Sequence, residues 1–433
     1  MMNEIIINPS KNDWSKLMQR PQINSKDLEE TVLEIINTVR AHGDEAVKNY
    51  SQKFHGLAPE NLWVTEDEIL QSTKKIEKNL KKAILLAKKN IEKFHKKQVE
   101  KIKKIETSPG VLCWRKSVPI ENVGLYIPGG SAPLFSTLLM LAIPAGIAGC
   151  KDILVTTPAN KNGDVAQAIL FVAHILGIKN IYKGGGAQAI ASMAYGTQTI
   201  GKVDKIFGPG NQYVTCAKKL VNIDGVGIDM LAGPSELAIY ADETCVPEFV
   251  AADLLSQAEH GADSQVILVA VNQQIIEKVI QEIIKQLPLL PRLEVIEKSF
   301  LNRRFIVMEN KEEAFDFLNE YAPEHLIIAS DNAEQLSEKV RSAGSVFLGN
   351  FSPESAGDYA SGTNHSLPTN GLAKTFSGVS VDSFVKKITF QKLNTTGIKS
   401  IGHAVEKMAE AEGLLGHKNA VSIRLKKVDN GKI

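Results

Sequence analysis

From residue 122 onward, short apolar runs alternate with longer segments whose apolar residues recur every three or four positions. The short runs predict buried strands and the longer segments predict helices. Nine strands are predicted, at residues 123–127, 153–157, 180–182, 205–207, 236–240, 265–271, 304–308, 325–328 and 345–348. Helices are predicted between them, for example at residues 165–176 and 247–259. This alternation predicts an α/β architecture with largely parallel sheets.

Residues 26–106 are predicted to be helical. Residues 74–106 contain 13 Lys and only 4 Glu, a bias that a nucleic-acid surface would also show. Apolar residues nevertheless recur there at steps of three and four, namely Ile76, Leu80, Ala83, Ala87, Ile91 and Phe94. We therefore interpret the stretch as a long amphipathic helix whose lysines face water.

The composition is that of an ordinary soluble globular protein, with 433 residues, 43% of them hydrophobic and 23% charged. Its net charge of +1 argues against a dedicated nucleic-acid binder. The longest apolar stretch, residues 138–149, is too short to span a bilayer, and the first residues do not resemble a secretory signal. We expect a cytoplasmic protein whose widely spaced cysteines are free thiols and form no thiolate metal site: Cys113, Cys150, Cys216 and Cys245.

Two motifs carry His beside other polar groups. Gln257 and His260 stand three residues apart at the end of a predicted helix that Gly261 would cap, an arrangement that suits two metal ligands or two exposed polar residues. Glu324 and His325 follow Pro323 and begin a predicted strand, which suits either repeated proton transfer or an ordinary ion pair.

A polar stretch without predicted structure, residues 349–369, follows the last predicted strand in the α/β region. Long loops in compact proteins are often functional, so Asp358 is a candidate metal ligand and His365 a candidate substrate contact. Taken alone, His417 near the end of the chain is typical of a surface residue.

Three glycine-rich turns lie at or just after strand ends, at residues 126–130, 184–189 and 207–211. Open α/β sheets bind ligands at such positions. The second turn fits the pattern G-x-G-x-x-A, and Asp204 follows twenty residues after Gly184, but a single match of this kind does not establish a nucleotide site.

Taken together, these motifs resemble the histidinol dehydrogenase family over essentially the whole chain. The matching stretches are GLYIPGGSAPLFSTLLM (124–140), GGAQAIA (185–191), FGPGNQYVT (207–215), AGPSE (232–236), ADLLSQAEHG (252–261), YAPEHL (321–326), SAGDYASGTNHSLPT (355–369) and EGLLGHKNAV (412–421). The resemblance implies NAD-linked, metal-dependent oxidation of L-histidinol to L-histidine through histidinaldehyde, the final steps of histidine biosynthesis.

The resemblance also implies a residue for each role. The zinc ligands would be Gln257, His260, Asp358 and His417, a nitrogen and oxygen set that also suits manganese. Glu324 and His325 would be the acid–base residues, and Tyr126, Gln188 and Asn211 would contact NAD, whereas Asp204 is not counted as a site residue. The substrate would contact Ser235, Gln257, His260, His325, Asp358, His365, Glu412 and His417. One zinc ion is expected per subunit.

Family members are homodimers in which the C-terminal segment reaches the partner's site, so we expect Glu412 and His417 to complete the other subunit's site. The expected fold has two incomplete Rossmann-like parallel-sheet domains. The expected parts are a segment at 1–25, a helical region at 26–120 joined to the second α/β domain, a first α/β domain on the NAD side at 121–234, a second α/β domain at 235–382, and a helical appendage at 383–433 with a short strand at 422–425.

Neutral His325 is the expected base for the alcohol, and Glu324 is expected to activate water for the aldehyde. This division of roles is a hypothesis. The alternatives are a related enzyme for another amino alcohol, a non-catalytic zinc- or nucleotide-binding regulator on the same fold, and a nucleic-acid role for the Lys-rich helix.

Overall fold

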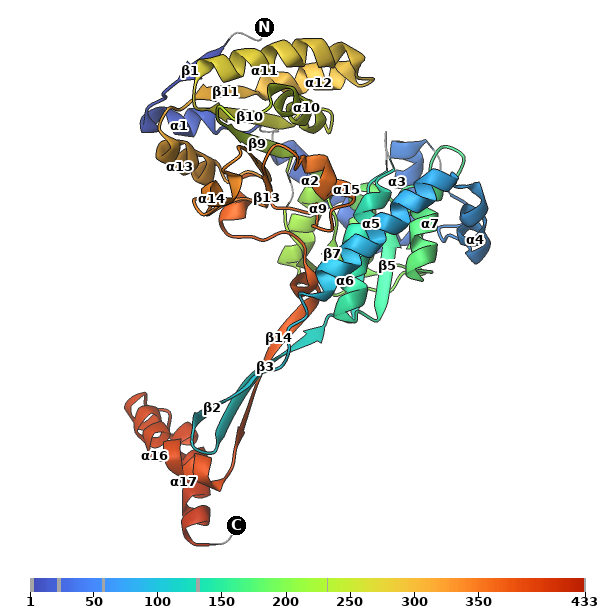
Figure 1. Ribbon diagram of the computed structural model, residues 1–433. Coiled ribbons are helices and arrows are strands. Elements are labelled where there is room, and N and C mark those ends of the chain that lie inside the picture. Colours follow the sequence, from blue (N-terminus) through green and yellow to red (C-terminus); the bar gives the residue numbers. More distant parts are fainter. Residues whose placement is uncertain (1–3, 22–24, 57–58, 130–132, 232, 432–433) are drawn as a thin grey trace.

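A computed structural model describes residues 4–21, 25–56, 59–129, 133–231 and 233–431 (Figure 1). Two parallel sheets form its two α/β halves, and a long antiparallel ribbon projects from them. The strands are β1 (Ile5–Ile7), β2 (Lys104–Ser108), β3 (Val111–Pro119), β4 (Asn122–Tyr126), β5 (Asp152–Thr156), β6 (Ile181–Tyr182), β7 (Lys205–Phe207), β8 (Gly227–Ile228), β9 (Glu236–Ala241), β10 (Gln265–Ala270), β11 (Arg304–Val307), β12 (His325–Ala329), β13 (Ser345–Leu348) and β14 (Val385–Leu393).

The helices are α1 (Lys11–Leu17), α2 (Ser25–His42), α3 (Asp44–His55), α4 (Glu66–Lys75), α5 (Lys78–Lys96), α6 (Phe135–Ala148), α7 (Gln167–Leu176), α8 (Gly186–Tyr195), α9 (Gln212–Ile223), α10 (Pro247–Ala258), α11 (Gln273–Gln286), α12 (Leu293–Ser299), α13 (Lys311–Tyr321), α14 (Ala333–Ser337), α15 (Glu354–Tyr359), α16 (Thr395–Ala411) and α17 (Leu415–Asp429). Most of the helices lie around the two parallel sheets, and α16 and α17 lie at the far end of the ribbon. Short 3₁₀ turns lie at Leu287–Leu289, Phe300–Asn302, Leu372–Lys374 and Val381–Phe384.

The nine predicted strands are all present, each within one residue of its expected bounds. Four of them join β8 in a five-stranded parallel sheet of order β6-β5-β4-β7-β8. The other five join β1 in a six-stranded parallel sheet of order β1-β11-β10-β9-β12-β13. The apolar runs identified these strands because parallel strands are buried on both faces, and β9, β10 and β12 are buried along their whole length. The predicted α/β class is confirmed.

Residues 5–17 belong to the second half. Strand β1 extends the six-stranded sheet by pairing in parallel with β11. Helix α1 follows and buries Trp14, whose ring packs edge-on against Phe317 of α13 with 5.5 Å between ring centroids. The N-terminal segment therefore packs on the second α/β half, whose other strands begin more than two hundred residues later in the sequence.

The structure corrects two expectations for residues 26–120. First, helix α5 ends at Lys96, and β2 begins at Lys104, so the predicted long helix stops earlier. Its buried face contains Ile84 and His95, whereas Ala83 and Phe94, which were expected on that face, are exposed. The expected face assumed one continuous helix from Ile76, but α4 ends at Lys75 and α5 begins at Lys78 as a separate helix. Second, α2 to α5 pack chiefly against α6 to α9 of the first α/β domain and not on the second, since their apolar stripes cover those helices.

The ribbon consists of β2, β3 and β14, with β3 in the centre, and carries α16 and α17 at its far end (Figure 1). The expected short strand at 422–425 is wrong, because these residues lie within α17. There Leu425 is buried against α16, where a Cβ on Gly402 would lie 2.9 Å from the Leu425 side chain. Helix-on-helix packing thus accounts for the apolar residue that suggested a strand.

Two smaller expectations also change. The stretch 349–369 contains helix α15, so it is not a structureless loop. Gly261 does not cap α10, because the helix ends at Ala258 and Glu259 takes the C-cap position, which leaves His260 just beyond the helix.

Within the described residues, no helix is long and apolar enough to cross a bilayer.

Candidate active site

A cleft of about 360 Å³ lies between the two α/β halves. The first half contributes the turns at the carboxyl ends of β4 and β7, and the second half contributes the residues at the amino ends of β9 and β12. Seven of the predicted site residues line this cleft: Asn211, Ser235, His260, Glu324, His325, Asp358 and His365. Gly130 of the first glycine-rich turn and Ala232 of the AGPSE stretch lie outside the described residues.

His325 is buried and neutral. Its Nδ1 lies 3.2 Å from the main-chain O of Glu236, and because a carbonyl can only accept, Nδ1 carries the proton. Nε2 therefore has a free lone pair, and no hydrogen-bond partner for it is found among the described residues. Burial, together with the nearby His260, lowers the pKa of His325 to about 3. The ring is therefore unprotonated at Nε2 over the ordinary pH range.

Glu324 is also buried, and its Oε2 accepts a hydrogen bond from the main-chain N–H of Glu236 at 3.0 Å. Burial raises the pKa of Glu324 well above its usual value, and the nearby charges of Glu236 and Asp358 act in the same direction. Its Oε2 lies 3.7 Å from Nδ1 of His325. The pKa of Glu324 is thus raised and that of His325 lowered, although the two side chains are neighbours in the cleft. Such a pair of groups with separated pKa values is typical of acid–base catalysis.

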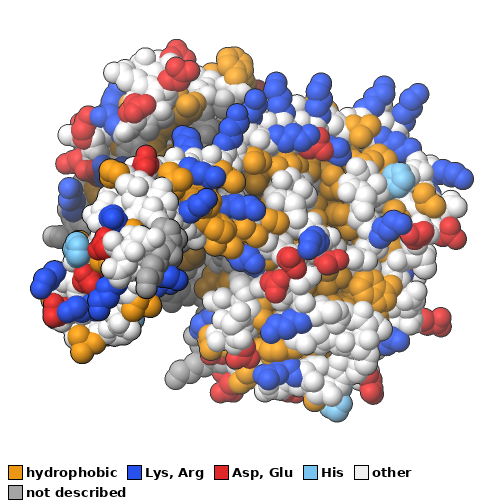
Figure 2. All heavy atoms as spheres, turned by 90° about the horizontal axis from the view of Figure 1, so that it is seen from below, with side chains coloured by type: hydrophobic (Ala, Val, Ile, Leu, Met, Phe, Trp, Pro, Cys, Tyr) orange, Lys and Arg blue, Asp and Glu red, His pale blue; other side chains and the backbone are white. Residues whose placement is uncertain are grey.

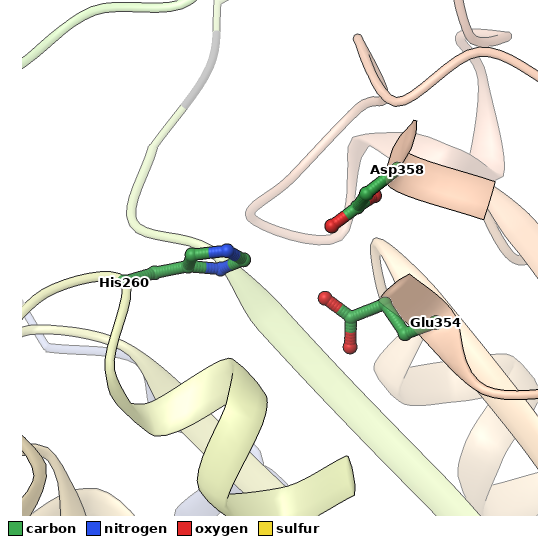
Figure 3. Close-up of side chains that lie close together, drawn as sticks. All are labelled: His260, Glu354 and Asp358. Carbon is green, nitrogen blue, oxygen red and sulfur yellow. The ribbon is translucent and has the colours of Figure 1, made fainter. Parts of the chain in front are cut away.

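Metal-binding side chains converge beside this pair. Ligand atoms of His260, Glu354 and Asp358 all lie within 4.8 Å of one another. Figure 3 shows the imidazole from the turn after α10 facing the two carboxylates of α15. Burial raises the pKa of Asp358 to about 7, so a bound cation would favour the ionised form that it needs as a ligand. This nitrogen and oxygen set fits zinc.

Gln257 reaches the same cluster from the last turn of α10. With its amide nitrogen turned toward Glu354, it donates to the two carboxylate oxygens at 2.6 and 3.2 Å, and its oxygen accepts from Nδ1 of His260 at 3.2 Å. The structure thus brings together three of the four predicted ligands, Gln257, His260 and Asp358.

Sequence reasoning missed Glu354, which is 1% exposed and lies 3.6 Å from Nδ1 of His325. The available signal was its spacing of four residues from Asp358, which places both carboxylates on one face of a helix. The polar composition of residues 349–369 predicts a loop, and a loop would not place the two carboxylates together.

His365 and Ser235 form part of the cleft wall. Nδ1 of His365 donates to the main-chain O of Asp358 at 3.0 Å, and its Nε2 lies 3.2 Å from Oγ1 of Thr137 on α6. Burial lowers the pKa of His365 to about 4, so this ring too is neutral. It links the two halves of the protein across the cleft.

Two predicted NAD contacts are buried behind the cleft at the glycine-rich turn before α8. The hydroxyl of Tyr126 accepts the N–H of Gly186 at 3.1 Å. Gln188 is fully buried, and neither amide atom has a hydrogen-bond partner within the described residues. A buried amide left without partners calls for a polar ligand, which fits a dinucleotide at this turn. Asn211 caps α9 by accepting from the N–H groups of Tyr213 and Val214.

A buried ion pair stabilises the glycine-rich turn after β7. Lys218 pairs with Asp229 and donates to the main-chain O of Gly208 at 2.9 Å, while Asp229 accepts the N–H of Gly208 at 2.8 Å. Gly208 has φ +126°, and a Cβ there would collide with the main-chain O of Tyr126. The turn depends on both the glycine and the pair.

Replacing Asp229 by asparagine is expected to lower the free energy of unfolding by about 3–5 kcal/mol, because it leaves the Lys218 charge buried and uncompensated. Chemical denaturation measures the change. The control is Glu29→Gln, which removes an exposed partner of Lys219 at 3.2 Å and is expected to cost under about 1 kcal/mol. Equal small effects would contradict the role given to the buried pair.

The structure does not bring Glu412 and His417 to this cleft. Both are exposed on the appendage, at the end of α16 and in the first turn of α17 (Figure 1). Asp204, which was not counted as a site residue, accepts hydrogen bonds from the main chain and side chain of Asn122.

Comparisons with known proteins identify the family of this chain. A family model described as histidinol dehydrogenase matches residues 18–425. Histidinol dehydrogenase of Bacteroides thetaiotaomicron is 55% identical over 98% of this chain and 99% of its own length, and that of Campylobacter jejuni strain RM1221 is 51% identical over 94% and 95%. The crystal structure of histidinol dehydrogenase from Elizabethkingia anophelis has a TM-score of 0.96 at 54% identity and covers 98% of both chains. The chain belongs to the histidinol dehydrogenase family.

Proposed function

We propose that this protein oxidises L-histidinol to L-histidine by way of histidinaldehyde, with two equivalents of NAD and one zinc ion per subunit. The observation that carries this proposal is the free Nε2 lone pair of His325, which lies beside a cluster of nitrogen and oxygen ligands in a cleft between two α/β halves. We expect the enzyme to act in the cytoplasm, without a nucleic-acid or membrane partner.

The ligands of this chain would be Gln257, His260 and Asp358, with His417 coming from a second copy. Zinc, when bound, supplies a Lewis acid that holds the imidazole and amine nitrogens of the substrate. Ser235 and His365 line the same cleft, and we assign them to substrate contact together with Glu412 of the second copy. Holding one substrate in place matters because both oxidations use the same site.

NAD, when bound, would supply the hydride acceptor for each oxidation, and we assign its contacts to Tyr126, Gln188 and Asn211. In the first step Nε2 of His325 takes the hydroxyl proton as the hydride leaves the alcohol carbon. His325 then releases this proton to solvent. Glu324 takes a proton from the water that adds to the aldehyde, and the aldehyde oxygen gains a proton as the hydrate forms. His325 takes the hydroxyl proton of the hydrate in the second oxidation. None of the four cysteines lines the cleft, so no thiol stands ready to form a thiohemiacetal.

We also propose a homodimer that shares its active sites. Glu412 follows α16 and His417 lies in α17, and Figure 1 shows both helices at the far end of the ribbon, away from the two α/β halves. Large apolar side chains are exposed there, including Met408 at 66% and Leu415 at 64%. Figure 2 views this side of the molecule and shows hydrophobic side chains at the surface between charged ones. Contact with a second copy would bury these side chains.

The test is the NADH formed per histidinol consumed, measured before chelation, after it and after zinc is returned. We expect two NADH per histidinol, activity lost on chelation and regained with zinc. One NADH with accumulating aldehyde would reject the coupled second oxidation and favour an alcohol dehydrogenase for a related amino alcohol. No NADH from folded, zinc-loaded protein would favour a non-catalytic regulator.

A further inference from the structure

The acid–base pair is held by the main chain of a single residue, Glu236, at the start of β9. Its N–H donates to Oε2 of Glu324 at 3.0 Å, and its C=O accepts Nδ1–H of His325 at 3.2 Å. Strands β9 and β12 pair in parallel with His325 opposite Leu237, so both hydrogen bonds lie where the two strands begin. The position of Glu236 therefore fixes the direction of both side chains.

The side chain of Glu236 is itself held by two segments distant in sequence. Nε of Arg20 donates to Oε1 at 2.6 Å and Nη2 donates to Oε2 at 3.0 Å, while the N–H of Asn370 donates to Oε1 at 2.7 Å. Glu236 is 2% exposed, and a buried carboxylate is stable only when it is paired. A two-pronged guanidinium contact fixes the plane of the carboxylate as well as its distance.

Arg20 also holds the turn that leads to the pair. Its Nη2 donates to the main-chain O of Tyr321 at 2.7 Å, and its guanidinium lies 4.1 Å from the centroid of the Tyr321 ring. Tyr321 ends α13, and Ala322 with φ +50° and Pro323 lead directly to Glu324. One guanidinium thus joins the start of β9 to the turn before β12.

We propose that Arg20, in the N-terminal segment, is a positioning residue for the acid–base pair. It fixes Glu236 and the turn after α13, so that Glu324 and His325 point into the cleft. Arg20 is not among the residues that line the cleft, so it acts through its neighbours. Its effect on turnover rests on the proposed function, whereas its hold on the pair does not.

Three variants separate positioning from stability. Arg20→Ala removes every contact of the guanidinium, and Arg20→Lys keeps the charge without the planar fork. Trp14→Leu weakens the docking of the same N-terminal segment against Phe317 and leaves the contacts of Arg20 in place. All are assayed at a temperature at which each is folded, with bound zinc measured.

Arg20→Ala is expected to lower kcat by about 10²-fold, the loss that a misplaced reacting group produces. Arg20→Lys should lose less, and KM for NAD should not change in either variant, because the assigned NAD contacts lie in the other α/β half. Trp14→Leu should lower Tm and keep kcat within about twofold of the wild type.

A second measurement needs no substrate. In protein labelled with ¹⁵N at histidine, Nδ1–H of His325, identified by its absence in His325→Asn, should be protected from solvent exchange in the wild type and in Trp14→Leu. It should lose that protection in Arg20→Ala or, if this variant does not fold, in Arg20→Lys.

A protected signal or an unchanged kcat in Arg20→Ala would overturn the proposal, and so would an equal loss of kcat in Trp14→Leu. A wild type that does not oxidise histidinol would refute the proposed function instead, and the histidine signal would still decide the role of Arg20.

Discussion

Replacing His325 by asparagine is expected to lower kcat for histidinol by about 10²–10⁴-fold, the range that a positioned general base contributes. Asparagine can still donate a hydrogen bond, but it has no basic nitrogen to take the substrate proton. Because the pKa of His325 is lowered to about 3, the wild-type ring is in its basic form at every practical assay pH. Steady-state NADH formation by zinc-loaded protein measures the loss.

Two variants sharpen this test. His403→Asn, which changes an exposed histidine of the appendage whose Nδ1 lies 3.0 Å from Oε2 of Glu406, should leave kcat unchanged. Glu324→Gln should impair oxidation of supplied aldehyde more than oxidation of the alcohol. Because the ionised carboxylate is the base, the aldehyde step should become faster as pH rises toward the raised pKa of Glu324, and the glutamine variant should lose this rise. Equal losses in both steps would contradict the division of roles, and a full rate in His325→Asn would exclude His325 as the base.

The parallel sheets could be predicted from sequence because most of their strands are buried and almost wholly apolar after a polar first residue, as in β10 (Gln265–Ala270). The antiparallel ribbon could not. Its outer strand β14 includes Lys386, Lys387 and Lys392 and is mostly exposed, so it lacks the apolar run by which buried strands are found. Strand β1 is only three residues long, and its pairing with β11 is set by contacts about three hundred residues apart.

The candidate site shows a similar limit. Asp358 and Gln257 carry recognisable chemistry in short motifs, but their assignment as ligands required the family resemblance. Glu354 and Arg20 act through contacts between segments distant in sequence. Arg20 and Glu236 are 216 positions apart, and nothing in the residues around either one indicates that they pair. Residues that hold a catalytic group in place are therefore harder to predict than the catalytic group itself.

The proposed exchange of appendages between subunits makes a second prediction with a large effect. His417→Asn and His260→Asn proteins should each be inactive alone and regain activity when their subunits are mixed. In a hybrid dimer with shared sites, one site receives both substitutions and the other receives neither, because each site takes His260 from one chain and His417 from the other. Random mixing makes half of the dimers hybrid, so about one quarter of the wild-type specific activity is expected.

Each variant refolded alone is the first control, and differently tagged subunits establish that hybrids form. Mixing wild type with a chain that carries both substitutions provides the converse test. If sites are shared, both sites of that hybrid are defective, and only wild-type dimers, about one quarter of the total, remain active. If each chain builds its own site, about half of the activity survives and the first mixture stays inactive. Shared sites therefore raise the activity of the first mixture, from zero to about one quarter, and lower the activity of the second, from about one half to about one quarter. A general loss of stability could not produce both changes.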